Sequence, residues 1–177
     1  WLNEIFSCVG SSPFFKLDKF SWIPEIEANI DIIQQEFQAI LDTVKIPNIQ
    51  ELSPEQCSLT TDDKWKLFCI YFYGIKVEKN CKKCPRTTAL LEKIPGLNAA
   101  MFSVLAPNKS IPPHRGAYNG VLRYHLGIQI PVNDKQCGIR VGQETRYWQN
   151  GKSLVFNERY EHEAWNHTEF YRVVLII

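Results

Sequence analysis

The stretch "CGIRVGQETRYWQNGKSLVFNERYEHEAWN", residues 137–166, contains four runs of five or six residues that suit β-strands. The linkers "GQ" and "QNG" between them hold residue types that form tight turns. Short strands that follow one another at this regular spacing are typical of antiparallel sandwiches and small barrels. The stretch therefore predicts an antiparallel β fold.

Strand candidates of the same kind cover residues 99–106, 120–131 and 169–177. Before residue 98 the pattern changes. Segment 64–77 is rich in aromatic and β-branched residues, which favour a strand, and segment 84–96 indicates a short helix that stops at "IPG". The β pattern thus dominates the second half of the chain.

An amphipathic helix is predicted over residues 23–44, where apolar residues recur at steps of three and four and Pro24 suits the first turn. The apolar positions are Ile23, Ile26, Ile30, Ile33, Phe37, Ile40 and Val44. We therefore expect one domain over residues 1–177. In it, a helical and strand part, residues 1–98, packs its helices outside a β core, residues 99–177.

The chain carries almost no net charge, because twenty Lys and Arg residues face nineteen Asp and Glu residues. Without a run of like charges we expect no nucleic-acid partner. No apolar stretch approaches the length of a membrane span, so association with a membrane would require a segment outside this sequence. The cellular compartment stays open.

Six cysteines could indicate disulfides, but four of them are scattered: Cys8, Cys57, Cys69 and Cys137. Cys81 and Cys84 form a lone C-x-x-C in "KNCKKC". A zinc site would need two more ligands at a similar spacing, and none is visible. A redox or disulfide pair and two ordinary thiols at a turn both remain open.

The strand candidate "VLRYHLGIQIP", residues 121–131, alternates apolar and polar side chains. Leu122, Tyr124, Leu126, Ile128 and Ile130 point one way, and Arg123, His125, Gly127 and Gln129 point the other. A solvated face is the simple explanation. Arginine and histidine beside a small glycine, together with three further features, favour a polar row that lines a cavity.

The first feature is a pair of histidines, His114 in "PPHRG" and His162 in "YEHEAW", each next to a strand candidate. Two imidazoles from separate β segments commonly hold iron(II), which accepts nitrogen and oxygen ligands. The alternative is a surface or hydrogen-bonded histidine in each case. The pair therefore makes an iron site a hypothesis and no more.

The other two features are Arg172 in "YRVVLII" and Ser103 in "AMFSVLAP". A buried guanidinium without a partner is costly, whereas a bound carboxylate would satisfy it with two parallel hydrogen bonds. The alternative is an arginine at a strand end that reaches solvent. Ser103 alone indicates almost nothing.

Residues 99–177 resemble the aspartyl/asparaginyl β-hydroxylase family of iron(II)- and 2-oxoglutarate-dependent oxygenases, whose catalytic domain is a double-stranded β-helix of the jelly-roll or cupin type. The motifs "PPHRG", "LRYHLG", residues 137–166 and "YRVVLII" occur in the family's order. Residues 79–107 extend the likeness and resemble the bacterial branch that includes lipid A hydroxylases. Residues 1–60 show no motif of the family.

The resemblance implies a role for each candidate residue. His114 and His162 become the iron ligands, Ser103 and Arg172 bind the distal carboxylate of 2-oxoglutarate, and His125 lies near the carboxylate that chelates the metal. Arg123 resembles an arginine that engages an acidic side chain of a peptide substrate.

Two positions depart from the pattern. Most oxygenases of this type use H-x-D, so that a carboxylate completes the metal site, but Gly116 stands in that place. The peptide hydroxylases of the family share this glycine, whereas the lipid A hydroxylases tend to carry the acid. Val121 replaces a second arginine that faces the substrate in the peptide hydroxylases, which puts an acidic substrate in doubt.

The resemblance implies a dioxygenase that hydroxylates an unactivated C–H bond, first of all in an aspartyl or asparaginyl residue of a peptide or protein or in a related small acidic substrate. Three alternatives remain: hydroxylation of a lipid acyl chain, a halogenase in which chloride takes the position left by Gly116, and a β-barrel binding module without a metal.

Overall fold

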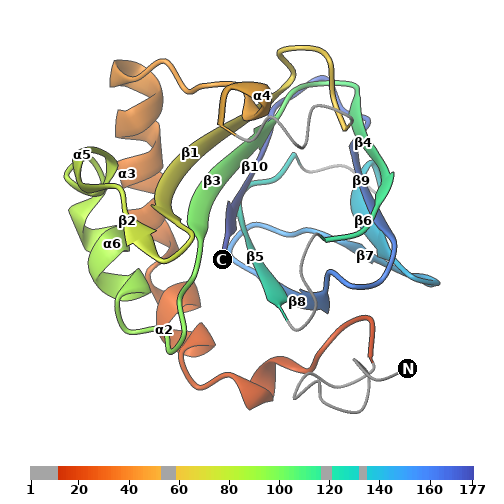
Figure 1. Cartoon of the computed structure of the whole chain (residues 1–177), viewed down its shortest axis with the longest axis horizontal. Helices are drawn as coiled ribbons and strands as arrows, with labels where there is room; N and C mark the ends of the chain where they lie inside the picture. Colours follow the sequence, from red (N-terminus) through yellow and green to blue (C-terminus); the bar gives the residue numbers. More distant parts are fainter. Residues whose placement is uncertain (1–11, 53–58, 117–120, 132–134) are drawn as a thin grey trace.

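The structure of the chain is a computed structural model that describes residues 12–52, 59–116, 121–131 and 135–177 (Figure 1). Its helical elements are η1 (Leu17–Lys19), α2 (Ile23–Ala28), α3 (Ile30–Thr43), α4 (Ile49–Leu52), α5 (Glu78–Cys81) and α6 (Pro85–Leu91). Its strands are β1 (Trp65–Phe72), β2 (Ile75–Lys76), β3 (Ala100–Leu105), β4 (Lys109–His114), β5 (Leu122–Gln129), β6 (Cys137–Val141), β7 (Glu144–Tyr147), β8 (Ser153–Asn157), β9 (His162–Asn166) and β10 (Arg172–Ile176).

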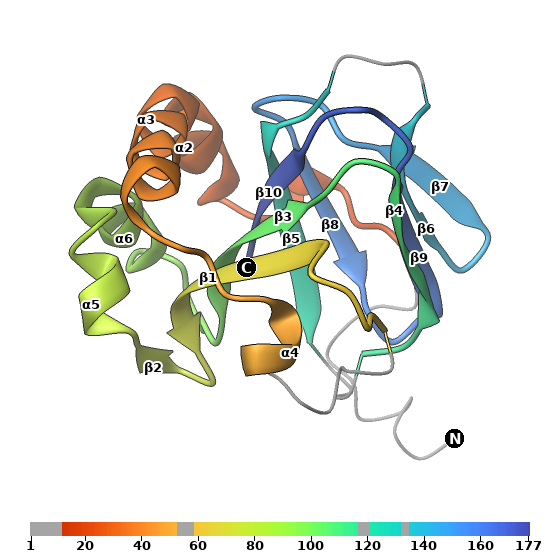
Figure 2. The ribbon, with the colours of Figure 1, turned by 90° about the horizontal axis from the view of Figure 1, so that it is seen from above.

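The strands form two antiparallel sheets that face each other. One has the order β2-β1-β3-β10-β5-β8 and the other the order β4-β9-β6-β7. Figures 1 and 2 show the two sheets enclosing an interior, with α2, α3 and α6 against the outer face of the larger sheet. The prediction of a mainly β, double-stranded β-helix with N-terminal helices packed on the outside is therefore confirmed.

The larger sheet buries both of its faces, because strand residues alternate between them. In β3, Ala100, Phe102 and Val104 pack with the helices in one apolar cluster, which includes Ile33 and Phe37 of α3. Met101 and Leu105 belong to a second cluster inside the barrel. A polar residue on the same face of β3 as Met101 and Leu105 consequently points into the barrel.

The structure differs from the sequence-based elements at two places before residue 98. The helix expected over residues 23–44 is broken at Asn29, whose side-chain Nδ2 donates to the Glu25 carbonyl at 2.8 Å. The strand expected over residues 64–77 is a hairpin, because Tyr73 and Gly74 both adopt positive φ (49° and 75°). Two consecutive positive φ angles are the signature of a two-residue hairpin turn.

Strand β4 was not predicted, because Pro112 and Pro113 argue against a strand. Proline is tolerated there because β4 lies at the edge of its sheet and pairs only with β9. The missed strand matters, because its last residue is His114.

The C-x-x-C motif consists of two separate buried thiols, Cys81 and Cys84. The Cys81 Sγ donates to the carbonyl of Ile70 and the Cys84 Sγ to that of Asn80, each at 3.5 Å. Burial raises the pKa of the Cys84 thiol to about 12, which opposes redox chemistry at this site. Of the other cysteines, Cys8 and Cys57 lie outside the described residues.

Candidate active site

The two histidines meet across the smaller sheet. His114 ends β4, His162 begins β9, and the two residues are directly opposite in the antiparallel register. Their ring centroids lie 4.2 Å apart with the planes tilted by 57°. The sequence predicted both as metal ligands, and the fold brings them together from segments 48 residues apart.

Both imidazoles are held in the same way by the backbone. The Nδ1 of His114 lies 2.8 Å from the carbonyl of Pro112, and the Nδ1 of His162 lies 2.9 Å from that of Tyr160. A carbonyl accepts hydrogen bonds only, so each Nδ1 carries a proton, and in the neutral form of each ring the lone pair is on Nε2. Burial lowers the pKa of His162 to about 4, so this ring is neutral at pH 7. Two imidazoles side by side, each fixed through Nδ1 by a backbone carbonyl, suit a divalent metal bound through Nε2.

The space beside Gly116 is filled by Glu158. A Cβ placed on Gly116 would lie 2.6 Å from both Cγ and Cδ of Glu158, and the Gly116 N–H donates to the Glu158 carbonyl at 2.9 Å. Glu158 is buried and accepts two hydrogen bonds from Arg123, at 2.9 Å from Nε and 2.6 Å from Nη2. A carboxylate from another part of the chain therefore sits next to the glycine of "PPHRG".

Replacing Gly116 with alanine should destabilise the protein by roughly 1–3 kcal/mol, since Glu158 cannot move aside without breaking its pair with Arg123. In a Glu158→Ala background the same change should cost almost nothing. Thermal unfolding of the wild type, the two single variants and the double variant checks this as a double-mutant cycle. Additive costs would show that the two side chains do not compete for this space.

A line of aromatic rings leads inward from the histidines. The Phe156 ring lies 5.6 Å from His162 and 5.0 Å from His125, and His125 stacks on Trp148 at 5.9 Å. The guanidinium of Arg172 lies 4.6 Å above the Trp148 ring. Trp148 and Arg172 lie at the end of the barrel opposite the histidine pair. Asn166, at the far end of β9 from His162, donates to the carbonyl of Leu105, which faces Arg172 in the sheet.

The floor of the barrel carries polar donors that have no hydrogen-bond partner within the described part of the chain. They are the Nε and Nη1 of Arg172 and the Nε1 of Trp148, and the Nδ1 of His125 is also unpartnered. Arg172 is 1% exposed, and burial lowers its pKa to about 10, so it stays charged at pH 7. Burial and the charge of Arg172 hold the pKa of His125 well below its usual value. A cation buried with unused donors fits a bound carboxylate.

Ser103 lies on the same inner face as Arg172. It faces Val174 in the sheet, two residues from Arg172, so the two side chains are diagonal neighbours. The indole Nε1 of Trp65 donates to the Ser103 Oγ at 3.0 Å. This bond leaves the serine hydroxyl hydrogen available to donate toward the interior.

The polar row of β5, predicted to line a cavity, only partly faces the barrel interior. His125 and Arg123 face the interior side as expected, but Gly127 has a different cause. A Cβ on Gly127 would lie 2.1 Å from the carbonyl oxygen of Gln149, so the glycine permits close contact between backbones. A bulge between β5 and β10 also moves Ile130 from the helix-side cluster to the barrel cluster.

Sequence reasoning missed Glu158, Trp148 and Trp65. The only signal for Glu158 was its place four residues before His162 in an acidic segment. The two tryptophans lie in strand candidates where an apolar residue needs no special explanation. Only the three-dimensional neighbours reveal their contacts with Arg172 and Ser103.

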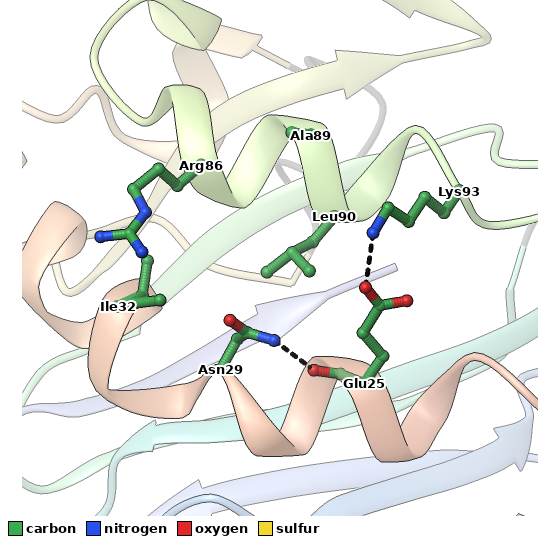
Figure 3. Close-up of a pocket in the computed structure, with 7 residues that line it drawn as sticks. All are labelled: Glu25, Asn29, Ile32, Arg86, Ala89, Leu90 and Lys93. Carbon is green, nitrogen blue, oxygen red and sulfur yellow. Dashed lines mark hydrogen bonds and ion pairs between the residues drawn. The ribbon is translucent and has the colours of Figure 1, made fainter.

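A separate hollow lies outside the barrel, between the N-terminal helices and α6 (Figure 3). Lys93 pairs with Glu25 across it, and the Nδ2 of Asn29 donates to the Glu25 backbone. Two of its charged groups, Glu25 and Lys93, thus already serve the contact between helices. The hollow has no histidine or cysteine in its lining and is not a candidate metal site.

A sequence model of the family described as aspartyl/asparaginyl beta-hydroxylase matches residues 27–177. An ornithine lipid ester-linked acyl 2-hydroxylase from Rhizobium tropici has 43% sequence identity to this chain. The alignment covers 99% of this chain and 63% of that protein. The aspartyl/asparaginyl beta-hydroxylase of Homo sapiens has 32% sequence identity to this chain, and the alignment covers 88% of this chain but only 20% of that protein. The likeness thus reaches into residues 1–60, where no family motif was recognised.

Among solved structures, a cupin domain of a transcriptional regulator from Enterobacter cloacae covers 64% of this chain and 93% of its own, with 12% identity and a TM-score of 0.43. This similarity is too low to bear on function.

Proposed function

Because this chain belongs to the aspartyl/asparaginyl beta-hydroxylase family, we propose that it is an iron(II)- and 2-oxoglutarate-dependent dioxygenase that hydroxylates an unactivated C–H bond. One observation carries the proposal. A pair of histidines with free Nε2 atoms stands at one end of the barrel, and a buried guanidinium with unused donors stands at the other. A metal at the first place and a dicarboxylate that reaches the second would satisfy both.

The residues fit these two groups by their donor chemistry. His114 and His162 would hold the metal, and Arg172 with Ser103 would bind the distal carboxylate of 2-oxoglutarate. His125 would lie beside the end of the molecule that chelates the metal. Iron(II) and 2-oxoglutarate together supply oxidising power from molecular oxygen and release succinate and carbon dioxide.

The chain's own contribution is orientation and the exclusion of water. The carbonyls of Pro112 and Tyr160 fix the two metal-facing rings, and Trp148 supports the plane of the Arg172 guanidinium. The Phe156 ring contacts both His162 and His125 and adds an apolar wall beside them. Fixed ligands in a dry pocket need little reorganisation when oxygen reacts.

For the substrate, the structure changes the order of preference. Arg123, the residue implied to bind an acidic side chain, is already paired with the buried carboxylate of Glu158. Val121 supplies no second cation. An acidic substrate would have to displace Glu158, whereas an acyl chain would not. Together with the named activity of the Rhizobium tropici relative, this makes the acyl chain of a lipid our first candidate and an aspartyl or asparaginyl substrate the second.

A halogenase is disfavoured by the same pair of residues. Chloride would need the space beside Gly116, which the Glu158 side chain already fills. A binding module without a metal would leave the two adjacent, oriented imidazoles of His114 and His162 unexplained.

Incubation with iron(II), 2-oxoglutarate and a lipid that has ester-linked acyl chains should release succinate and add the mass of one oxygen to an acyl chain. An aspartate-containing peptide serves as the second arm. Omitting chloride should leave the rate unchanged. A chlorinated product would establish the halogenase, and succinate release that no lipid or peptide raises above background would remove both substrate candidates.

A further inference from the structure

The turn between β1 and β2 exposes two large side chains, Tyr73 (52% exposed) and Ile75 (70%). The turn is well defined, because Tyr73 and Gly74 form a two-residue hairpin loop in which Phe72 pairs with Ile75. The Gly74 N–H donates to the carbonyl of Asn98 at 2.6 Å, which ties the loop to the segment before β3. The fold thus holds an aromatic and an aliphatic side chain outward.

Three exposed lysines follow immediately, on α5 and the residues after it: Lys79, Lys82 and Lys83. Cys81 and Cys84 are buried and fix this segment against the sheet. Within the described part of the chain, none of the three lysines forms an ion pair, whereas nearby Lys76 pairs with Glu92 at 2.7 Å. An apolar tip therefore stands next to three exposed lysines without ion pairs, with one exposed carboxylate, Glu78, on the same short helix.

The registers of β1, β3 and β10 place the β1–β2 turn at the end of the larger sheet away from Arg172, which is the end of the barrel that carries the histidine pair. Figure 2 shows the β1–β2 turn and α4 toward the lower edge of the molecule, and β4 running toward that edge on the other side of the barrel. Since β4 ends at His114, the exposed turn and the histidine pair face the same side. Arg115, which follows His114, is also exposed there and donates to the carbonyl of Arg159.

We propose that the β1–β2 turn and the α5 lysines form a docking surface for a bilayer that contains anionic lipids. Tyrosine suits the boundary between headgroups and acyl chains, an exposed isoleucine gains by leaving water, and lysines are attracted to anionic headgroups. The purpose of such docking rests on the proposed lipid substrate, which would be presented to the histidine pair from the membrane. No described helix is long and apolar enough to cross a membrane, so contact through the described residues would be peripheral. Such contact differs from the sequence-based expectation that membrane association requires a segment outside this sequence.

Two variants test the surface, Ile75→Asp and the triple change of Lys79, Lys82 and Lys83 to glutamine. Each has a matched control. For Ile75 the control is Phe170, which is 69% exposed in the β9–β10 connection, near the end of β9 that is farther from His162. For the lysines the control is a set of three exposed lysines elsewhere, Lys19, Lys135 and Lys152. The controls are therefore Phe170→Asp and the change of Lys19, Lys135 and Lys152 to glutamine, which alter the same types of side chain away from the proposed surface.

The measurement is co-sedimentation with vesicles of phosphatidylcholine, alone or mixed with phosphatidylglycerol. The wild type should bind the mixed vesicles, bind plain ones far less, and be released by salt. Both test variants should bind at least about tenfold more weakly, given three lysines that each interact with an anionic surface, and both controls should bind like the wild type. No binding by the wild type, or equal losses in test and control variants, would overturn the docking surface.

Turnover separates this result from the proposed function. With substrate dispersed in detergent, the docking variants should release succinate at the wild-type rate. Vesicle binding without any succinate release would refute the enzyme and leave the docking surface standing. Succinate release with no vesicle binding would refute the docking surface and leave the proposed enzyme standing.

Discussion

Alanine at His114 or His162 should abolish retention of iron(II) and reduce turnover to background. The two rings are the only proposed protein ligands, and their Nε2 atoms are aimed by the carbonyls of Pro112 and Tyr160. Losing one leaves a single imidazole, which cannot hold a divalent metal at micromolar concentration. Calorimetric titration with Mn(II), with and without 2-oxoglutarate, measures the loss directly.

His167 provides the matched control, because it is exposed, contacts Ser110 at 3.2 Å and stacks on Trp165 away from the histidine pair. His167→Ala should bind metal like the wild type, and all three variants should keep the far-UV circular dichroism of the fold. Unchanged metal affinity in either His114→Ala or His162→Ala would refute the assignment.

The strands after residue 134 could be predicted from sequence because they are short and most are separated by turn residues. Segment 137–141 matches β6 exactly, and β7 and β8 differ from the expectation by one residue at their ends. Strand β4 could not be found, since its two prolines are allowed only by its position at a sheet edge. That position depends on the whole fold and on no local pattern.

The same distinction applies to the candidate site. The inward direction of Ser103, His125 and Arg172 follows from alternation along single strands, which a sequence displays. The pairing of Arg123 with Glu158 joins residues 35 positions apart, and the support of Arg172 by Trp148 joins two different sheet regions. These contacts decide which charges are available to a ligand, and a sequence read alone contains no signal for them.

The Arg123–Glu158 pair shows the consequence. From sequence, Arg123 is a free cation on a polar face and an acidic substrate is its natural partner. In the structure, the carboxylate of Glu158 already occupies it at 2.6 Å, so the local charge is balanced before any substrate arrives. The residue that suggested one substrate class thereby becomes an argument for another.

Lysine in place of Arg172 should weaken the binding of 2-oxoglutarate by about ten- to a hundredfold. A charge-assisted hydrogen-bonded pair is worth roughly 1.5–3 kcal/mol, and each 1.4 kcal/mol is a factor of about ten. Lysine keeps a positive charge but loses the planar fork that binds a carboxylate through two bonds, and it cannot lie flat over Trp148 as the guanidinium does at 4.6 Å. Its ammonium would also be buried at a place where the described part of the chain offers no hydrogen-bond partner to Nε and Nη1 of Arg172.

Calorimetric titration of 2-oxoglutarate into the Mn(II)-loaded protein measures this affinity without turnover. Arg140→Lys is the matched control, because Arg140 pairs with Glu161 and Glu163 in a partly exposed position and has no proposed role in the site. The control should bind 2-oxoglutarate like the wild type. Succinate, which keeps a distal carboxylate but lacks the keto acid, should lose affinity in Arg172→Lys by a similar factor, because the change acts at the carboxylate that the two molecules share. Equal 2-oxoglutarate affinities for Arg172→Lys and the wild type would mean that this buried guanidinium serves another ligand.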